Sequence, residues 1–461
     1  MSLVKGTNVT VKVRFKRSSQ IVPRRSVAGV VVERPTHWLA NIGTWLTACA
    51  LVFFSAGGTF SFYDPEANTQ MGAVTGAGGG GATAIGVMIG RLVLVGLFYV
   101  AWRSAAQVRR AAFCVPLLAL LNCMGVISCL WSPMPTFTLK QGIYLLVTYT
   151  FAIAFVSKPA ETQMKFLQLA GTIAIVLTVL TVALFPSYGL NGRQGVTGEW
   201  EGIYAGKNVC AMAIMFLLMP ALYRQPATLQ GRVLRNVYIF AALVVIGMTR
   251  SRTGWGIAVL LVLFSIGLKL LARFKSFDRS VLFILFCAAT LVVGTVVLLN
   301  LSTVFQFIGR DTSFSGRTSI WSAILASIHK QPWTGYGYRT FWRGMTGESA
   351  NVMVSIGWMM GYAHDGFLSV WVEVGGVALA LLVLSLLKGL KDSWHCFMRD
   401  PSPQVLWYIT IIVFGILYNI DEASFLFRFN LSWMMIIAAI VGLDRKRRQL
   451  RRNAAALVLR R

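Results

Sequence analysis

Apolar residues occur along this chain in long runs that are separated by shorter polar segments. Most runs are about 20 residues long, enough for an α-helix to cross roughly 30 Å of hydrocarbon. The pattern predicts twelve transmembrane helices, at about 37–56, 84–102, 113–131, 139–157, 166–186, 207–223, 235–249, 254–272, 280–302, 363–387, 404–420 and 429–443.

The predicted fold class is therefore all-α, a polytopic integral membrane protein with about 12 transmembrane helices. Composition agrees with this class, since 56% of the residues are hydrophobic, 13% are charged and the mean hydropathy is +0.66. Soluble domains have about 45–50% apolar and roughly 25% charged residues, so a soluble protein is excluded. We expect a basic N-terminal arm at 1–35, a transmembrane domain at 36–443 with a large loop at about 303–362, and a basic tail at 444–461.

The distribution of charge predicts how the helices are oriented. Lys and Arg accumulate on the cytoplasmic side of membrane proteins, and most of the 43 Lys and Arg residues lie there if both termini are cytoplasmic. The net charge of +27 then reflects orientation and attraction to anionic lipid headgroups. Because the basic residues are scattered over short loops rather than gathered on a folded domain, nucleic-acid binding is not expected. The cations that this orientation places on the outer side are Arg91, Lys140, Arg193, Lys207, Arg250, Arg252, Arg310, Arg317, Lys330, Arg339, Arg343 and Arg428.

Three of these outer cations stand where a helix is expected to begin. Lys207 precedes the sixth predicted span, and Arg252 follows Ser251, a suitable N-cap for the eighth. Arg317 opens a short amphipathic helix that ends before Pro332. A helix N-terminus presents free N–H groups and a partial positive charge, so an added cation makes an anion site. Each cation alone could be a solvated loop charge, but together they favour a ligand that carries phosphate.

One histidine lies at the predicted outer boundary of the membrane. His364 begins the run "HDGFLSVWVEVGG", whereas His37 and His395 lie inside and His329 is expected to be buried in the helix of the outer loop. A neutral imidazole can act as a base near pH 7. A structural role is the alternative for such a residue, and the nearby Arg252 and Arg317 favour the catalytic one.

Six motifs resemble those of a known family, in the expected order. They are "SCLWSPMPTFTLKQ" (128–141), "GRQGVTGEWEGIYAGKNVCA" (192–211), "TRSRTGWG" (249–256), "GRTSIWSAIL" (316–325), "HKQPWTGYGYRTF" (329–341) and "AHDGFLSVWVEVGG" (363–376). They resemble the bacterial O-antigen ligase and Wzy-type polymerase superfamily, most closely its exopolysaccharide-polymerase branch, the ExoQ-like proteins. The resemblance implies a GT-C-type glycosyltransferase of the bacterial inner membrane, which joins glycans carried on undecaprenyl diphosphate at its periplasmic face.

The resemblance also assigns roles to residues. The essential histidine of the family falls on His364. Its phosphate-engaging arginines fall on Arg252 and Arg317, and the arginine and lysine of the preceding loop fall on Arg193 and Lys207. Two residues are expected to support the site. They are Arg250, in the motif of Arg252, and Asp365, which could orient the imidazole and stands where ligase-like members often carry Asn.

These assignments predict an inverting transfer that needs no cofactor. Guanidinium groups would stabilise the leaving diphosphate, and His364 would accept the proton of the acceptor hydroxyl. The expected reaction is polymerisation of undecaprenyl-diphosphate-linked oligosaccharides, with membrane lipids, the growing polysaccharide or a lipid acceptor, and chain-length and export proteins as partners. Transfer to lipid A core by a ligase, or transport of the lipid-linked glycan by a transporter or flippase, are the alternatives. A metal held by Asp64 and Glu66 would replace the arginines, and the other acidic pair on this face is Asp421 and Glu422.

Overall fold

The computed structural model describes residues 42–57, 84–190, 198–275, 278–282, 285, 317–357 and 359–459. Within these ranges the chain is helical and contains no strand, apart from an isolated antiparallel bridge between Leu190 and Trp200. The all-α prediction is confirmed for this part of the chain. The predicted N-terminal arm at 1–35 and most of the predicted span at 280–302 lie outside the described residues.

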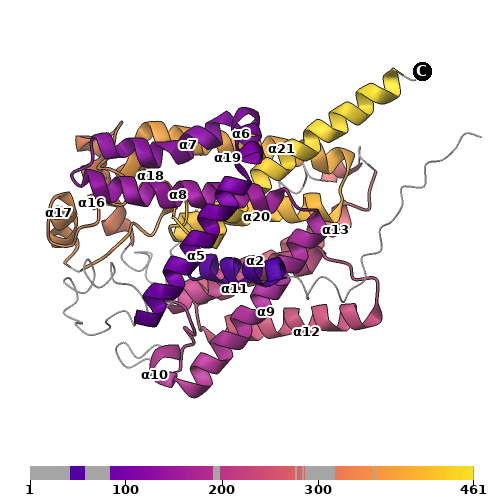
Figure 1. Cartoon of the computed structure of the whole chain (residues 1–461), viewed down its shortest axis with the longest axis horizontal. Helices are drawn as coiled ribbons and strands as arrows, with labels where there is room; N and C mark the ends of the chain where they lie inside the picture. Colours follow the sequence, from indigo (N-terminus) through magenta and orange to yellow (C-terminus); the bar gives the residue numbers. More distant parts are fainter. Residues whose placement is uncertain are drawn as a thin grey trace, which may run out of the picture. The chain divides into compact units, whose positions relative to one another are not determined.

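Figure 1 colours the described helices in the order of the sequence, from indigo to yellow. They are α2 (Ile42–Ser55), α5 (Ala84–Arg103), α6 (Ala105–Cys114), α7 (Pro116–Ile127), the short 3-10 helix η1 (Ser128–Leu130), α8 (Pro135–Val156), α9 (Ala160–Leu184), α10 (Pro186–Gly189), α11 (Lys207–Tyr223), α12 (Leu229–Met248), α13 (Arg252–Leu271), α16 (Arg317–Lys330), α17 (Glu348–Ile356), α18 (Gly366–Val374), α19 (Gly376–Arg399), α20 (Pro403–Asp421) and α21 (Leu431–Val458).

The apolar helices identify a membrane protein. Five of the described helices are long and apolar enough to cross a bilayer, namely α8, α9, α12, α13 and α20. A sixth span is present if α6 and the α7–η1 segment, which are bent by 114° at their junction, are counted together. Helices α2 and α11 are apolar but shorter. The predicted number of twelve spans stays a prediction, because the described residues cover only part of the chain.

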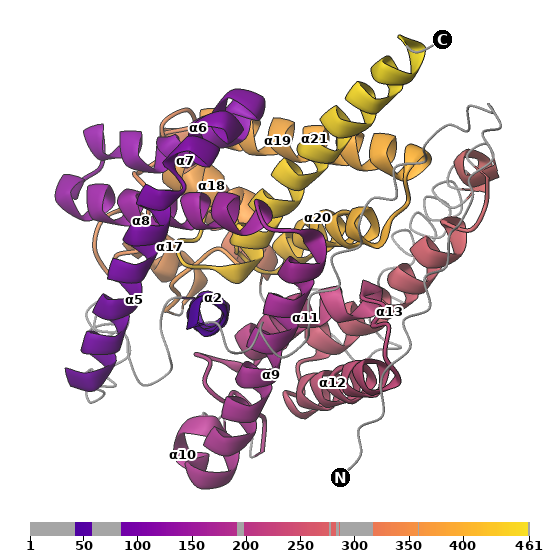
Figure 2. The ribbon, with the colours of Figure 1, turned by 45° about the vertical axis from the view of Figure 1, so that its right-hand side comes forward.

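The helices pack around two buried elements, as Figures 1 and 2 show. Helix α11 contacts α9, α12, α13 and α20, while α21 lies against α8, α19 and α20. Most residues of α11 and all residues of the first half of α21 are buried. A helix that is apolar on every side is expected at the centre of a bundle, because no face of it gains from exposure to water. The candidate site lies at one end of α11.

Helix α21 continues past the apolar segment into the predicted basic tail. Asp444 is buried and pairs with Lys388 of α19 at 2.9 Å and with Arg448 at 2.7 Å. Residues 451–459 are exposed, and in Figure 2 the helix extends beyond its neighbours. These ion pairs compensate the charge of the buried Asp444 at the point where α21 leaves its helical neighbours. The helix is unbroken through this point.

The predicted span at 363–387 is not one continuous helix, and that prediction was wrong. The chain breaks at Gly375, whose φ is +92°, and this divides the segment into α18 and α19. A Cβ atom on Gly375 would lie 2.1 Å from the carbonyl oxygen of Trp333, and Gly376 N donates to Pro332 O at 2.8 Å. The outer loop therefore inserts its backbone at the break. Irregular backbone in a membrane protein is tolerated where protein surrounds it.

The described part of the large outer loop has its own apolar core. Ile320, Ile324 and Ile328 of α16 are buried against α17 and the segment before α18, which confirms the amphipathic helix that the sequence predicts. His329 was expected to be buried, but it lies exposed in the last turn of α16, because the apolar stripe faces the other way.

An ion pair joins the two helices of this loop. Lys330 of α16 pairs with Glu348 at the start of α17. Burial raises the pKa of Glu348, but hydrogen bonds from Lys330 and Asn351 outweigh this effect and leave the pKa below its ordinary value. The pair therefore stabilises the outer loop while Glu348 is ionised.

Candidate functional site

His364 is held in a backbone conformation that side chains other than glycine rarely adopt. Its φ is +50°, and it stands two residues before the first residue of α18. The next residue, Asp365, is the N-cap, and its Oδ1 accepts a hydrogen bond from Leu368 N at 2.7 Å. On the other side, Trp321 Nε1 of α16 donates to Ala363 O at 3.1 Å. Non-glycine residues with positive φ persist where the surrounding structure forces them, and they are common at functional sites.

The start of α18 is pressed directly against the end of α20. A Cβ atom on Gly366 would lie 2.1 Å from Asn419 Oδ1. That oxygen accepts hydrogen bonds from Ser424 N at 2.7 Å and Phe425 N at 2.9 Å, so it shapes the loop after α20. Because only glycine permits this approach, Gly366 brings His364 next to Glu422, the C-cap residue of α20.

Glu422 is the carboxylate in contact with the imidazole. His364 Nδ1 lies 3.3 Å from Glu422 Oε2, and the two side chains are 21% and 6% exposed. Nδ1 and Oε2 are within hydrogen-bond distance, but an N–H group on Nδ1 does not point at the oxygen closely enough to form a hydrogen bond in this structure. The ring of Tyr362 packs over the imidazole with centroids 4.1 Å apart. The carboxylate of Asp365, which was expected to orient the imidazole, caps α18 instead, and the carboxylate beside the ring is that of Glu422.

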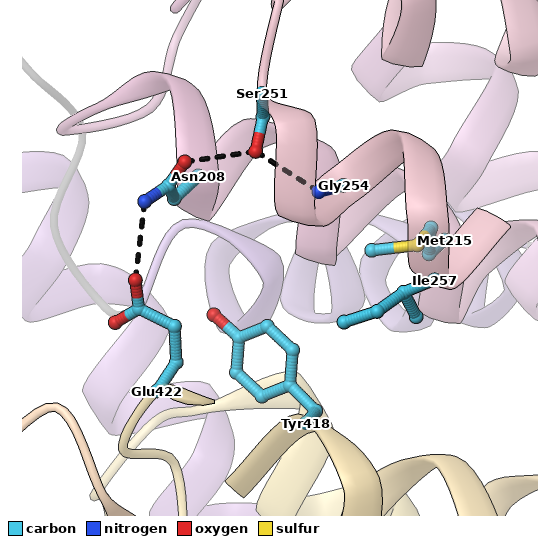
Figure 3. A pocket seen from close by; sticks show the side chains of 7 residues that line it. All are labelled: Asn208, Met215, Ser251, Gly254, Ile257, Tyr418 and Glu422. Carbon is cyan, nitrogen blue, oxygen red and sulfur yellow. Dashed lines mark hydrogen bonds between the residues drawn. The ribbon is translucent and has the colours of Figure 1, made fainter. Parts of the chain in front are cut away.

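A chain of side-chain hydrogen bonds leads from Glu422 to two helix N-termini. Figure 3 shows the hydrogen-bonded side chains of Glu422, Asn208 and Ser251 pointing toward one another. Asn208 Nδ2 donates to Glu422 Oε1 at 3.1 Å, and Ser251 Oγ donates to Asn208 Oδ1 at 2.8 Å. Ser251 Oγ also accepts from Gly254 N at 3.0 Å, which confirms Ser251 as the N-cap of α13. Asn208 belongs to the first turn of α11, so α11, α13 and α20 are joined at this point.

These side chains form the polar end of a small pocket. Its other lining residues are Tyr418 of α20 and, farther along α11 and α13, the apolar Met215 and Ile257 (Figure 3). The pocket is therefore polar near Glu422 and apolar deeper between the helices.

The predicted cations are placed at helix starts, as the sequence indicates. Lys207 is the first residue of α11, Arg252 the first of α13 and Arg317 the first of α16. The side chains of Arg252 and Arg317, and the whole of Arg193, lie outside what the structure describes. Arg250 has a φ of +49° and precedes the Ser251 cap.

Lys207 has a partner that the sequence analysis did not identify. Its Nζ lies 2.6 Å from Oε1 of Glu199, a buried carboxylate of the preceding loop. The two residues are close in the sequence, in "GEWEGIYAGK", but no local spacing rule pairs them. The lysine expected to engage phosphate is thus neutralised by a carboxylate in this structure.

The N-termini of α11, α13 and α18 therefore meet near one histidine. Asn208, Ser251 and Glu422 connect them, while Trp321 connects α16 to the residue before His364. Free N–H groups at helix N-termini attract anions. Over the ranges that the structure describes, no three His, Cys, Asp or Glu side chains gather into a metal site, and Asp64 and Glu66 fall outside those ranges.

Comparisons with known proteins show which family and which proteins this chain resembles. Residues 237–383, from α12 to α19, match the family model described as O-antigen ligase. Over this range the chain is similar to the O-antigen ligase family. The matched range includes Ser251, Arg252, Arg317 and His364, and it leaves out Glu422.

Two relatives are similar to this chain over longer stretches than the family model. The exopolysaccharide production protein ExoQ of Rhizobium meliloti is 23% identical over 304 residues, which are 62% of this chain and 68% of ExoQ. The ComP-specific O-oligosaccharyltransferase of Acinetobacter baylyi is 26% identical over 218 residues, 45% of this chain but only 38% of that protein. The predicted resemblance to the ligase and ExoQ-like superfamily is confirmed.

Proposed function

We propose that this protein is a membrane glycosyltransferase that joins lipid-diphosphate-linked oligosaccharide repeats into a polysaccharide. The observation that carries the proposal is the position of His364, held in a left-handed conformation and linked through Glu422, Asn208 and Ser251 to the N-termini of α11 and α13. A base and an anion site side by side are what glycosyl transfer from a diphosphate requires. The relationship to a protein named for exopolysaccharide production and to an oligosaccharyltransferase supports a glycan substrate.

The chemistry follows from the residue types. His364 takes the proton of the acceptor hydroxyl as its oxygen attacks the anomeric carbon of the donor. The bond from that carbon to the diphosphate oxygen breaks, and undecaprenyl diphosphate leaves with the electron pair. Arg252 and Arg317, together with the N–H groups of the helix turns that they open, stabilise the charge on the leaving group. A direct displacement of this kind inverts the anomeric configuration and uses cationic side chains where other transferases use a metal.

The proposed orientation has both termini in the cytoplasm, the site facing the periplasm and the protein in the bacterial inner membrane. It is supported by the concentration of Lys and Arg in the segments that this orientation makes cytoplasmic. Donor glycans would then be consumed on the side where the outer cations and His364 lie.

Ligation is the second candidate. A ligase performs the same displacement with lipid A core as the acceptor, and the family model and the second relative favour it. The ExoQ relationship covers more of this chain and favours polymerisation. A transporter or flippase of the same glycan forms no glycosidic bond, so an assay for bond formation distinguishes it from both transferases.

The decisive experiment uses purified protein in proteoliposomes with a synthetic polyprenyl-diphosphate-linked repeat unit. Wild-type protein should form glycosidic bonds, and His364→Ala should lose about 10²–10⁴-fold in rate, the usual contribution of a general base. His329→Ala is the matched control, because His329 is exposed at the far end of α16. Full activity of His364→Ala would contradict the mechanism, and movement of intact donor without bond formation would indicate a transporter.

The glycans that accumulate in cells distinguish the two transferases. A polymerase without its base leaves single repeat units and no long chains. A ligase without its base leaves long chains attached to undecaprenyl diphosphate. We expect the first pattern for His364→Ala, and the second would assign the protein to the ligases.

A further inference from the structure

We propose that Glu422 is a positioning residue for His364, and that Asn208 and Ser251 set its place relative to the helix turns of the anion site. The expected effect on kcat rests on the proposed function, whereas the expected tautomer of the His364 imidazole does not depend on it. Sequence motifs do not mark Glu422, and the matched family range ends before it.

The first step concerns the tautomer of the histidine. A neutral imidazole carries one N–H, and a carboxylate beside one nitrogen favours the tautomer with the proton on that nitrogen. Glu422 Oε2 lies 3.3 Å from Nδ1 of His364. The proton is therefore placed on Nδ1, and the lone pair needed to accept a proton from the acceptor hydroxyl is left on Nε2.

The second step concerns what holds the carboxylate. Glu422 is 6% exposed, and its other oxygen accepts a hydrogen bond from Asn208 Nδ2 at 3.1 Å. Asn208 cannot turn without losing its second bond, which Ser251 donates to Oδ1 at 2.8 Å. Ser251 is itself engaged with Gly254 N. The carboxylate is thus tied to the first turns of α11 and α13, where Lys207 and Arg252 begin the helices.

The third step concerns charge during the reaction. When Nε2 accepts the proton, the ring becomes a cation, and an adjacent buried carboxylate stabilises that cation more than an amide does. Asp365 cannot serve, because its carboxylate caps α18. Glu422 therefore acts through His364 and touches no reacting atom.

The kinetic test compares Glu422→Gln with the wild type on the synthetic lipid-linked donor. We expect kcat to fall about 10- to 100-fold, as for other residues that orient a functional histidine, with the KM for donor changed by less than about threefold. Glu348→Gln is the control: this carboxylate of the outer loop pairs with Lys330, and the variant should keep the kcat and KM of the wild type at a temperature where it remains folded. A raised KM with unchanged kcat would overturn the assignment, because Glu422 would then bind the donor.

A double-mutant cycle separates positioning from a general structural role. If Glu422 acts only through the imidazole, adding Glu422→Gln to His364→Ala should cost no further activity. An equal loss in both backgrounds would overturn the proposal. If His364→Ala itself keeps full activity, the proposed function fails, and the tautomer measurement still decides the role of Glu422.

The tautomer is read directly, without any substrate. In protein labelled with ¹⁵N-histidine, the His364 signals are assigned by their loss in His364→Ala. We expect a protonated Nδ1 and an unprotonated Nε2 in the wild type, and a mixture of tautomers in Glu422→Ala. A protonated Nε2 in the wild type, or a spectrum that Glu422→Ala leaves unchanged, would refute the positioning role.

Discussion

The contact between Gly366 and Asn419 offers the sharpest test of how the site is built. In Gly366→Ala, the added Cβ would lie 2.1 Å from Asn419 Oδ1 and 2.7 Å from Cγ of the same side chain. Both distances are far below van der Waals contact. Either α18 moves away from α20 or the side chain of Asn419 turns, and each response separates His364 from Glu422.

The size of the effect follows from the bonds that Asn419 makes. Its Oδ1 accepts from Ser424 N and Phe425 N, and all of these groups are buried. Losing two buried hydrogen bonds costs about 1 kcal/mol each, and overpacking adds about 1–3 kcal/mol, so we expect a loss of about 3–5 kcal/mol in the free energy of unfolding. The variant should also lose activity, because the loop that carries Glu422 is displaced.

The assay is thermal unfolding of the purified protein in detergent, together with turnover of the lipid-linked donor. Gly267→Ala is the control, because a Cβ there meets no atom within 4 Å and alanine is the better helix former. Gly366→Ala should unfold several degrees below the control and show a lower kcat. If the two variants had the same Tm and the same activity, the close packing of α18 on α20 would be wrong.

Three further predictions follow. Activity, measured as bond formation from the synthetic donor, should survive EDTA. If EDTA abolished activity and Mg²⁺ or Mn²⁺ restored it, a metal held by Asp64 and Glu66 would bind the diphosphate in place of the arginines. Arg317→Lys should lose most activity because it keeps the charge but not the planar fork, whereas Arg343→Lys in the same loop should be nearly silent; equal tolerance would make Arg317 a solvated charge. Since the pKa of Glu348 is lower in the folded protein, its carboxylate stabilises the fold above about pH 4, and this contribution disappears as the pH falls through the folded pKa. Glu348→Gln should therefore lower Tm at pH 7, and its difference from the wild type should disappear as the pH falls through the folded pKa of Glu348; a difference that stays constant with pH would contradict this.

Much of the fold was predictable because it depends on local properties of the chain. Within the described residues, helices α8, α9, α11, α12, α13 and α20 lie close to the predicted spans, since a long apolar run forms a helix wherever it is placed in a membrane. The break at Gly375 was missed, because a glycine pair in an apolar run has no local signal that tells a kink from a packing contact. The carbonyl of Trp333, which reaches the break, comes from another part of the chain.

The features of the candidate site also fall into two groups, those that local sequence predicts and those that depend on helix packing. The sequence by itself determined that a histidine stands just before α18, that Ser251 caps α13, and that cations begin three helices, because capping and helix starts depend on neighbouring residues. Only the tertiary structure decided that Glu422 faces His364 and that Asn208 joins it to Ser251. Those contacts connect side chains on different helices, and helix packing, set by close approaches such as Gly366 on Asn419, brings them within bonding distance.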